Sequence, residues 1–483
     1  MNNSEKANFT LKKITNYVCY RSVVFLLIIN LTSFNQVFSK NYFEISFGQS
    51  GSDVSRSVIQ LSSGSIFTAG YSDTAQLGNI DFAINKFSEN GLLIYTKYFG
   101  DSLVDNCLGM CLINNSQIIM CGEKYTSNNS FDGIVYKLDT LGNILWELQI
   151  GELLKNESIK YIFQTSDGNL LACGFITDSN FSNDFLVVKI SSSGNLIWQK
   201  TFGDDNNNTA NMCIELSNGN YAIVGDAQSH LGDYDVMIVV TDIDGNEIWE
   251  NRFGNNLQNG SQGIFESSDN KLIVYGETEI FTASPFDFFA QKITFTGNSL
   301  WRKTFGGTKS DAIFNGIEIA DGFVFTGYSN SYNAGPLNLV VLKTDTTASN
   351  IEWARNYGST GVDIGYQIIK SKTDSGFYIV GIYDDLGNTN NYLLHINNDG
   401  LLFQDEIISN SIGKLYPNPS SGKFSIDSKQ KIEEVIIYNT VGEIIYSQLA
   451  PEKEINLNNI NKGLYFVHTK TQINKSMHKL ILE

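Results

Sequence analysis

Six side chains that could bind a ligand or exchange protons each follow a glycine, and these glycines are spaced 51 or 52 residues apart. They are Tyr71, Glu123, Phe175, Asp226, Glu277 and Tyr328. Aromatic and acidic side chains at repeated positions suit the binding of a glycan or a peptide. The three carboxylates could instead serve glycoside hydrolysis, which needs two carboxyl groups about 5 to 10 Å apart. The plainer alternative is that all six are solvated strand ends.

The sequence gives little support for a metal site or a catalytic nucleophile. A multi-histidine zinc site or a Ser-His-Asp triad would depend on the isolated His230 or His395, because the other two histidines lie near the C-terminus. Residues 242–246 resemble the start of a calcium loop but lack its later ligands, so we expect a hairpin turn there. The six cysteines have no regular spacing and suggest no disulfide framework. We therefore predict no metal site, no cofactor and no catalytic residue.

The N-terminal segment predicts export. Basic residues, among them Lys12 and Arg21, precede an apolar run over residues 23–34, and small residues follow. This order is typical of a signal peptide, here residues 1–39 with cleavage after Ser39. A membrane anchor is the alternative, but the run is shorter than the ~20 residues of a spanning helix. We expect no transmembrane segment in the mature protein.

The charge of the chain limits its partners. The net charge is −18, and removal of the basic N-terminal segment makes the exported form more acidic. Nucleic-acid contacts need clustered Lys and Arg, and the sequence has no such cluster. We therefore predict no nucleic-acid partner and no attraction to an anionic membrane surface.

Three series of residues show that the chain is built from repeats. A large side chain recurs at intervals of 50 to 52 residues: Tyr95, Trp146, Trp198, Trp249, Trp301, Trp353 and Phe403. A glycine marks the middle of each unit: Gly70, Gly122, Gly174, Gly225, Gly276, Gly327 and Gly381. An Asp or Asn near the start of each unit is expected to cap the loop between units: Asp53, Asp105, Asn156, Asn208, Asn259, Asp311 and Asp363.

Each unit contains four strand-like segments, which in the first unit span residues 57–61, 65–71, 81–87 and 92–99 with short turns at 62–64 and 90–91. Four antiparallel strands in about 50 residues form one propeller blade. The sequence therefore predicts an all-β, seven-bladed β-propeller over residues 40–408, with repeats starting near 48, 100, 151, 203, 254, 306 and 358. The loops after the second and fourth strands are the long ones. A ligand is expected on the face that they share, which carries the six candidate residues.

The ring has two candidate closing strands. Residues 42–48 repeat the end of a blade, with Phe43 in the tryptophan position. This N-terminal strand could pair with the last blade and remove its exposed edge. Residues 401–408 are the alternative. We favour the N-terminal strand.

The third unit, with residues 184–190, then Gly194 to Trp198, then Thr201-Phe202-Gly203, resembles the β-propeller repeat family of secreted bacterial proteins. The pattern covers about residues 42–408, although the sixth unit lacks the glycine before Trp353. The Gly-x-x-x-Trp units are also similar to quinoprotein dehydrogenase repeats. This chain lacks the adjacent cysteines of those enzymes, so we interpret its tryptophans as structural contacts between blades.

A different pattern begins after a linker at residues 409–414. Residues 415–424 (LYPNPSSGKF) are followed by 435–443 (VIIYNTVGE), 462–467 (KGLYFV) and a terminal 479–482 (KLIL). The order indicates a small β-sandwich-like domain over residues 415–483. It resembles the type A C-terminal sorting domain of type IX secretion. This resemblance implies the secretion machinery as a partner, passage across both membranes and a secreted or cell-surface location.

Three functions remain open from the sequence. The first is a non-enzymatic binding or adhesion module for a glycan or protein ligand. The second is an extracellular carbohydrate-active enzyme that uses Glu123, Asp226 and Glu277. The third is a structural component of a surface layer.

Overall fold

The computed structural model describes residues 42–48, 51–73, 80–177, 182–254, 257–279, 285–331, 337–385, 387–402, 414–428, 431–439, 444–451, 454–457, 459–471 and 475–483. The expected signal peptide with Ser39, the aromatic Phe403 and the expected linker up to residue 413 lie outside the described residues.

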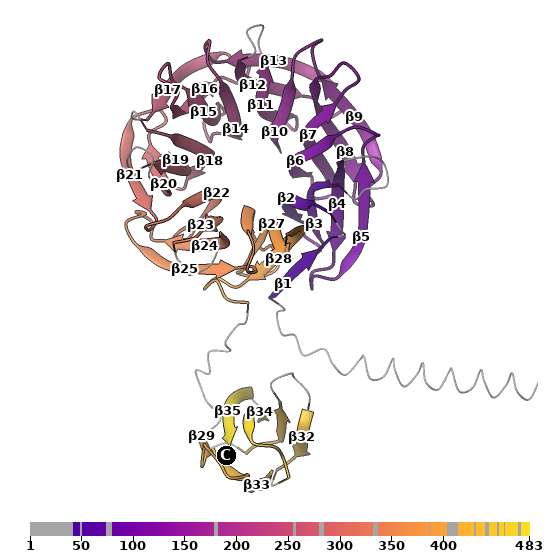
Figure 1. Ribbon diagram of the computed structural model, residues 1–483, viewed down its shortest axis with the longest axis vertical. Coiled ribbons are helices and arrows are strands. Elements are labelled where there is room, and N and C mark those ends of the chain that lie inside the picture. The colour runs from indigo at the N-terminus through magenta and orange to yellow at the C-terminus, as the bar shows by residue number, and fades with distance from the viewer. Residues whose placement is uncertain are drawn as a thin grey trace, which may run out of the picture.

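Seven four-stranded antiparallel sheets form the blades of a β-propeller (Figure 1). Blade 1 consists of β2 (Asp53–Gln60), β3 (Ile66–Ser72), β4 (Asp81–Phe87) and β5 (Leu93–Phe99). Blade 2 consists of β6 (Asp105–Ile113), β7 (Gln117–Tyr125), β8 (Phe131–Asp139) and β9 (Ile144–Ile150). Blade 3 consists of β10 (Glu157–Gln164), β11 (Leu170–Thr177), β12 (Asn183–Ile190) and β13 (Leu196–Phe202).

The next blades repeat this order, with the first strand innermost and the fourth on the rim (Figure 1). Blade 4 consists of β14 (Asn208–Glu215), β15 (Tyr221–Gln228), β16 (Tyr234–Thr241) and β17 (Glu247–Phe253). Blade 5 consists of β18 (Asn259–Ser267), β19 (Lys271–Glu279), β20 (Phe286–Ile293) and β21 (Ser299–Phe305). Blade 6 consists of β22 (Asp311–Ile319), β23 (Gly322–Ser329), β24 (Asn338–Thr344) and β25 (Ile351–Tyr357).

The N-terminal strand completes the ring. Blade 7 consists of β26 (Ile364–Lys370), β27 (Phe377–Asp385), β28 (Asn388–Ile396) and β1 (Phe43–Phe47). Strand β1 runs antiparallel to β28, from the pair Phe43 and His395 to the pair Phe47 and Asn391. The sequence prediction of an N-terminal closing strand is confirmed. The first strand of the propeller therefore lies on the rim of its last blade.

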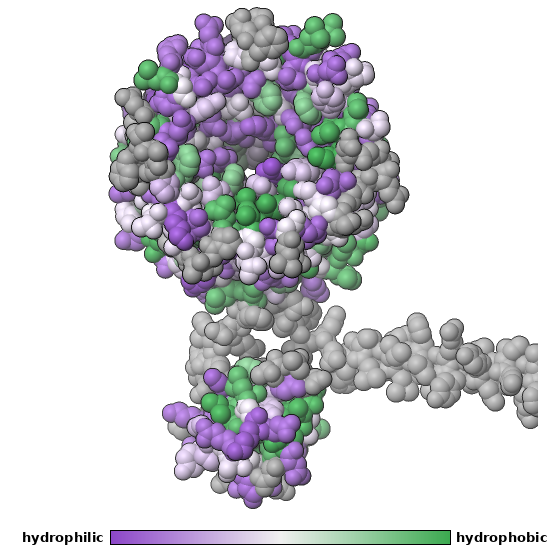
Figure 2. Space-filling model, viewed as in Figure 1, coloured by the Kyte–Doolittle hydropathy of each residue, from purple (hydrophilic) through white to green (hydrophobic). Residues whose placement is uncertain are grey.

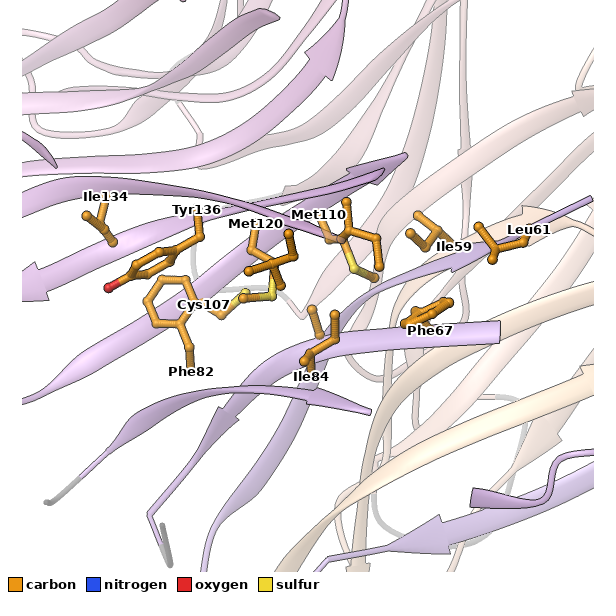
Figure 3. Close-up of a cluster of buried hydrophobic side chains, with 13 residues drawn as sticks. Ile59, Leu61, Phe67, Phe82, Ile84, Cys107, Met110, Met120, Ile134 and Tyr136 are labelled. Atoms are coloured by element: carbon orange, nitrogen blue, oxygen red, sulfur yellow. The ribbon is translucent and has the colours of Figure 1, made fainter. Parts of the chain in front are cut away.

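The core of the propeller lies between the blades. Among the described residues, each pair of neighbouring blades shares one cluster of buried apolar side chains. Figure 3 shows the cluster between blades 1 and 2, where Phe82 lies against Tyr136 with ring centroids 5.4 Å apart. Cys107 is buried in the same cluster as a free thiol. Burial of apolar side chains from two blades at a time holds neighbouring sheets together.

The periodic aromatics join the blades at the rim. The Trp146 ring on β9 lies under the turn of blade 3, so close that a Cβ on Gly194 would be 2.7 Å from it. The corresponding distance between Gly245 and Trp198 is 3.0 Å. Phe43 on β1 repeats this contact at the ring closure, with 2.9 Å to a Cβ on Gly91 in blade 1. The interpretation of the tryptophans as structural contacts between blades is confirmed.

The sixth blade shows why most of these turns need glycine. The turn glycines have positive φ, for example +88° at Gly194 and +76° at Gly245. Ala348 stands in the turn of blade 6 with a φ of 50°, and it is buried in the cluster that contains Trp301. A side chain at positive φ strains the backbone, so this blade retains the contact at some cost in stability.

The acidic and amide residues near the start of the units cap the loops between blades. Asp105 accepts a hydrogen bond from the backbone N–H of Asp101 at 3.0 Å, and Asp311 accepts one from Gly307 at 3.0 Å. Blade 3 differs from the prediction. Glu157 rather than Asn156 occupies this position, and its Oε1 accepts from the N–H of Glu152 at 3.1 Å.

Residue 156 is displaced because the pairing register of β10 is shifted by one residue: the partner of the mid-unit glycine lies eight residues after the opening glycine in blade 3, against seven in the other blades. The Asn156 side chain instead accepts from the N–H of Phe131 in blade 2, at 2.9 Å. In consequence Ile159, and not Ser158, pairs with the mid-unit glycine Gly174.

The C-terminal region forms a small β-sandwich-like domain. One sheet contains β29 (Lys414–Tyr416), β30 (Lys423–Asp427) and β33 (Glu454–Asn456). The other contains β31 (Glu434–Tyr438), β32 (Ile444–Leu449), β34 (Gly463–Lys470) and β35 (Lys475–Leu482). Buried apolar side chains from both sheets, such as Phe424 and Val467, form one core.

Candidate functional site

The innermost strand of every blade carries a β-bulge at the same place. In blade 1 the pairing of β2 with β3 skips one residue between Ser55 and Ser57, so Arg56 has no partner in the ladder. We call the seven skipped residues the bulge ring. Its members are Arg56, Leu108, Lys160, Asn211, Gln262, Phe314 and Tyr366. Bulges of this kind redirect a side chain out of the regular ladder.

The mid-unit glycines are required by these bulges. A Cβ on Gly70 would lie 1.8 Å from the carbonyl oxygen of Val54, and a Cβ on Gly122 would lie 1.8 Å from that of Asn106. In every other blade the equivalent distance is 2.0 Å or less. Any side chain would collide with the backbone of the innermost strand, so the glycine series marks where that strand approaches its neighbour most closely.

The bulge ring lines a cavity of about 270 Å³. All seven blades contribute to its wall, which places the cavity on the axis around which the blades are arranged (Figure 1). All seven ring side chains are half-buried, and no two are of the same residue type. Figure 2 shows hydrophilic and hydrophobic residues mixed around the centre of the propeller. The cavity therefore offers a chemically asymmetric wall on a symmetric scaffold.

One side of the ring is aromatic. The guanidinium carbon of Arg56 lies 4.0 Å from the centroid of the Tyr366 ring, a cation–π contact between blades 1 and 7. The Tyr366 ring in turn meets Phe314 of blade 6 edge to face, with centroids 5.4 Å apart. These contacts fix the orientation of the three side chains at the wall of the cavity.

A polar network lies on another part of the wall. Lys160 of blade 3 donates from Nζ to Oδ1 of Asn211 in blade 4, at 2.9 Å. The Asn211 amide donates to Oδ2 of Asp226 at 2.9 Å and to the carbonyl of Ser261 at 2.7 Å. Asp226 also accepts from the backbone N–H of Ser261 at 2.7 Å. Three neighbouring blades are thereby linked at the cavity.

The six residues predicted from the sequence lie on the second strand of their blades, next to the bulge ring. Each pairs with the residue two positions before the bulged one, as Tyr71 does with Val54 in blade 1. All six are half-buried. Tyr328 contacts Phe314 with ring centroids 6.0 Å apart, and Asp226 accepts the bond from Asn211. Phe175 and Glu277 belong to the same series on blades 3 and 5.

The three acids of this series have different surroundings. Glu123 accepts a hydrogen bond from Asn106 at 3.0 Å within its own blade. Burial raises the pKa of Asp226 above its usual value, although the bonds from Ser261 and Asn211 act in the opposite direction. Burial and, to a smaller extent, the charge of Asp226 raise the pKa of Glu277 to about 7. Two of the three acids are thus held in a desolvated environment.

The acidic turn at residues 242–246 has a structural role. Oδ1 of Asp242 accepts from the backbone N–H groups of Asp244 and Asn246, at 3.0 and 2.8 Å. This is the hairpin turn expected from the sequence. Within the part of the chain that the structure describes, no group of three or more His, Cys, Asp or Glu side chains is arranged to hold a metal ion.

Comparisons with known proteins identify the C-terminal domain. Residues 414–483 match the family described as the secretion system C-terminal sorting domain. A search of curated proteins gives no significant match. Among the described residues, no helix is both long and apolar enough to span a bilayer.

Several solved structures resemble the chain at low sequence identity. One is PorZ of Porphyromonas gingivalis, an essential bacterial surface component of the type IX secretion system, with 11% identity and a TM-score of 0.42 over 87% of this chain. This chain spans 58% of the length of PorZ. A Dyadobacter fermentans protein of unknown function has 15% identity and a TM-score of 0.41, and covers 62% of this chain and 98% of its own. The WD40 domain of Neurospora crassa Pan2 has 10% identity and a TM-score of 0.46, and covers 74% of this chain and 97% of its own.

The strand pairing defines the class of this protein as a seven-bladed β-propeller with a separate C-terminal β-domain. That second domain is a type IX secretion sorting domain. The protein is therefore exported by type IX secretion and reaches the cell surface or the medium.

Proposed function

We propose that the exported propeller is a non-enzymatic binding or adhesion module whose ligand enters the central cavity. One observation carries this proposal: the bulged position, alone among the repeated positions described above, holds seven different residues, and all seven line one cavity. The glycines, the loop caps and the rim aromatics are repeated because the fold requires them. Binding sites take the opposite form, since a rigid scaffold presents side chains that differ from one another.

The six residues predicted from the sequence form the second layer of the proposed site. Tyr328 supports Phe314, and Asp226 orients the Asn211 amide. We further infer that residues 1–39 act as the signal peptide that begins export, because basic residues, an apolar run and small residues follow one another up to Ser39.

The test is to fill the cavity without changing its charge. Leu108→Trp places a large apolar side chain in the bulge ring. The purified wild-type protein and this variant are compared on an array of glycans and host or matrix proteins, with thermal unfolding as the control for folding. We expect the wild-type protein to bind a restricted set of probes and the variant to lose them while its melting temperature stays within a few degrees. Binding that survives the filled cavity would contradict the proposal. An array that stays silent with the wild-type protein would also do so, and would favour a surface-layer component.

Carboxylate chemistry is the second candidate, favoured by the pKa of about 7 that Glu277 has beside Asp226. A carboxyl group with a raised pKa can serve as a general acid near neutral pH. If the propeller hydrolyses a glycoside, Glu277→Gln should abolish the release of a chromogenic sugar leaving group, whereas Glu279→Gln on the same strand should not. Unchanged hydrolysis by Glu277→Gln would rule out this role.

A further inference from the structure

The charged side chains that line the cavity are basic, within an acidic protein. Of the described residues that line it, only Arg56 and Lys160 carry a charge, and none is Asp or Glu. The whole chain has a net charge of −18. Acids lie directly behind this wall, because Asp226 accepts a hydrogen bond from Asn211 and the charges of Asp226 and Glu123 act on Lys160. The charged groups that line the cavity itself are the two cations, and they attract ligands of the opposite sign.

Arg56 has unused hydrogen-bonding capacity. Its guanidinium stacks on Tyr366, while its buried Nε has no hydrogen-bond partner and no carboxylate of the described residues lies within ion-pair distance. The stacking fixes the plane of the guanidinium group, and its N–H groups make no hydrogen bond among the described residues. A guanidinium edge matches a carboxylate, sulfate or phosphate group through two parallel hydrogen bonds.

Lys160 also has unused hydrogen-bonding capacity. Among the described residues, its ammonium donates one hydrogen bond, to the neutral oxygen of Asn211, and has no ion-pair partner. An ammonium has three donors, so two are available. Burial lowers the pKa of Lys160, and the charges of Asp226 and Glu123 oppose that effect. A cation that is desolvated without a bonded counter-ion gains most from an anion at hydrogen-bond distance.

The volume of the cavity and its uncharged side chains limit the size and chemistry of the rest of the ligand. The volume of about 270 Å³ is slightly below the range typical of drug-sized ligands, so the cavity holds a single ring or the end of a chain. Phe314 and Tyr366 supply aromatic surface, and the Gln262 amide has no hydrogen-bond partner within the described part of the chain. Aromatic surface beside one free amide suits the C–H face and the hydroxyl groups of a sugar.

We propose that the central cavity binds the anionic end of a saccharide, with the acidic group held between Arg56 and Lys160 and the sugar ring between Gln262 and the Phe314–Tyr366 pair. This inference rests on the proposed function, and it adds the class of ligand. The proposed ligands share an anionic group attached to a sugar. This group can be a carboxylate, a sulfate ester or a phosphate ester.

The experiment is calorimetric titration of the purified chain with a matched set of monosaccharides. Glucuronate and glucose share one ring and differ by the carboxylate, and glucose 6-sulfate and glucose 6-phosphate carry the other two anions. We expect at least one anionic sugar to bind tenfold or more tightly than glucose. Arg56→Gln and Lys160→Met should each weaken that binding tenfold or more, while Lys309→Met, which removes an exposed cation outside the cavity, should leave it unchanged.

The dependence on pH separates Lys160 from a merely structural residue. A bound anion favours the protonated amine, so the affinity should fall as the pH rises through the lowered pKa of Lys160. Lys160→Arg should retain the binding and lose this pH dependence, because a guanidinium stays charged.

Equal binding of glucose and all three anionic sugars, or no binding of any, would overturn the proposal. Binding that survives Arg56→Gln would also do so. If Leu108→Trp abolishes array binding while Arg56→Gln leaves it intact, the binding function stands and only the anionic ligand class is wrong.

Discussion

The rim and the axis of this propeller follow opposite rules. At the rim, an aromatic side chain of one blade lies against a turn of the next, and the same few residue types recur from Tyr95 to Trp353 and again at Phe43. At the axis, the bulge ring occupies an equally regular backbone position with seven different side chains. Repeated backbone geometry therefore does not by itself lead to repeated side chains. Side chains repeat where they must fit a neighbouring blade and vary where they face a cavity.

The largest expected effect comes from removing the contact that closes the rim. A chain without residues 42–48 loses β1, and with it the strand that covers the edge of β28 and the Phe43 contact on Gly91. We expect such a chain to aggregate or to melt at a far lower temperature, because a long unpaired strand edge is exposed. A chain that begins at residue 40 is the control. A monomeric, equally stable product of the shorter chain would show that the ring closes in another way.

A single rim aromatic should have a smaller effect. Trp198→Ala removes the ring that packs under Gly245 and beside Tyr221. We expect a loss of about 3 kcal/mol in the free energy of unfolding, the low end of the range for buried tryptophans, because Trp198 is half-buried. Chemical denaturation measures it. A change within error of zero would contradict the role of the rim aromatics in blade contact.

The loop cap in blade 3 should make stability depend on pH. Burial raises the pKa of Glu157 to about 7, from about 4.5 in the unfolded chain. The folded state therefore holds this proton more tightly, and the resulting stability is full below pH 4.5 and lost as the pH rises through 7. Glu157→Gln should reduce the fall in melting temperature between pH 4.5 and pH 8. An identical fall in variant and wild type would show that Glu157 does not contribute to it.

A bulge-ring residue should have the smallest effect on stability. Gln262 lines the cavity and makes no hydrogen bond within the described residues. Gln262→Ala should change the free energy of unfolding by less than about 0.5 kcal/mol, because this half-buried side chain faces the cavity and its removal breaks no hydrogen bond among the described residues. Thermal unfolding of this variant beside Trp198→Ala compares the axis with the rim directly. A loss as large as that of Trp198→Ala would remove the distinction between the two regions.

The repeats made the fold predictable, because each repeated residue has one geometric reason. Gly70 and its counterparts avoid a backbone collision, and the rim aromatics fit a turn. The bulge ring was missed, because a bulge depends on how two strands pair and no single residue type marks it. A signal existed in Ser55-Arg56-Ser57, where a long cation stands between two small residues in a buried strand. The displacement at Asn156 was missed for a related reason, since spacing from a glycine does not show where an extra loop residue is absorbed.

The pairing of β1 with β28 has a consequence for the order of synthesis. A ribosome completes β1 first and must add the remaining blades before its partner β28 exists, so the ring cannot close on an unfinished chain. The sorting domain begins at residue 414, after β28. Every chain that carries the sorting domain therefore already contains the strands of all seven blades. A product that ends before β28 presents an unpaired strand to its neighbours and also lacks the sorting domain, so we expect that it is not exported by type IX secretion.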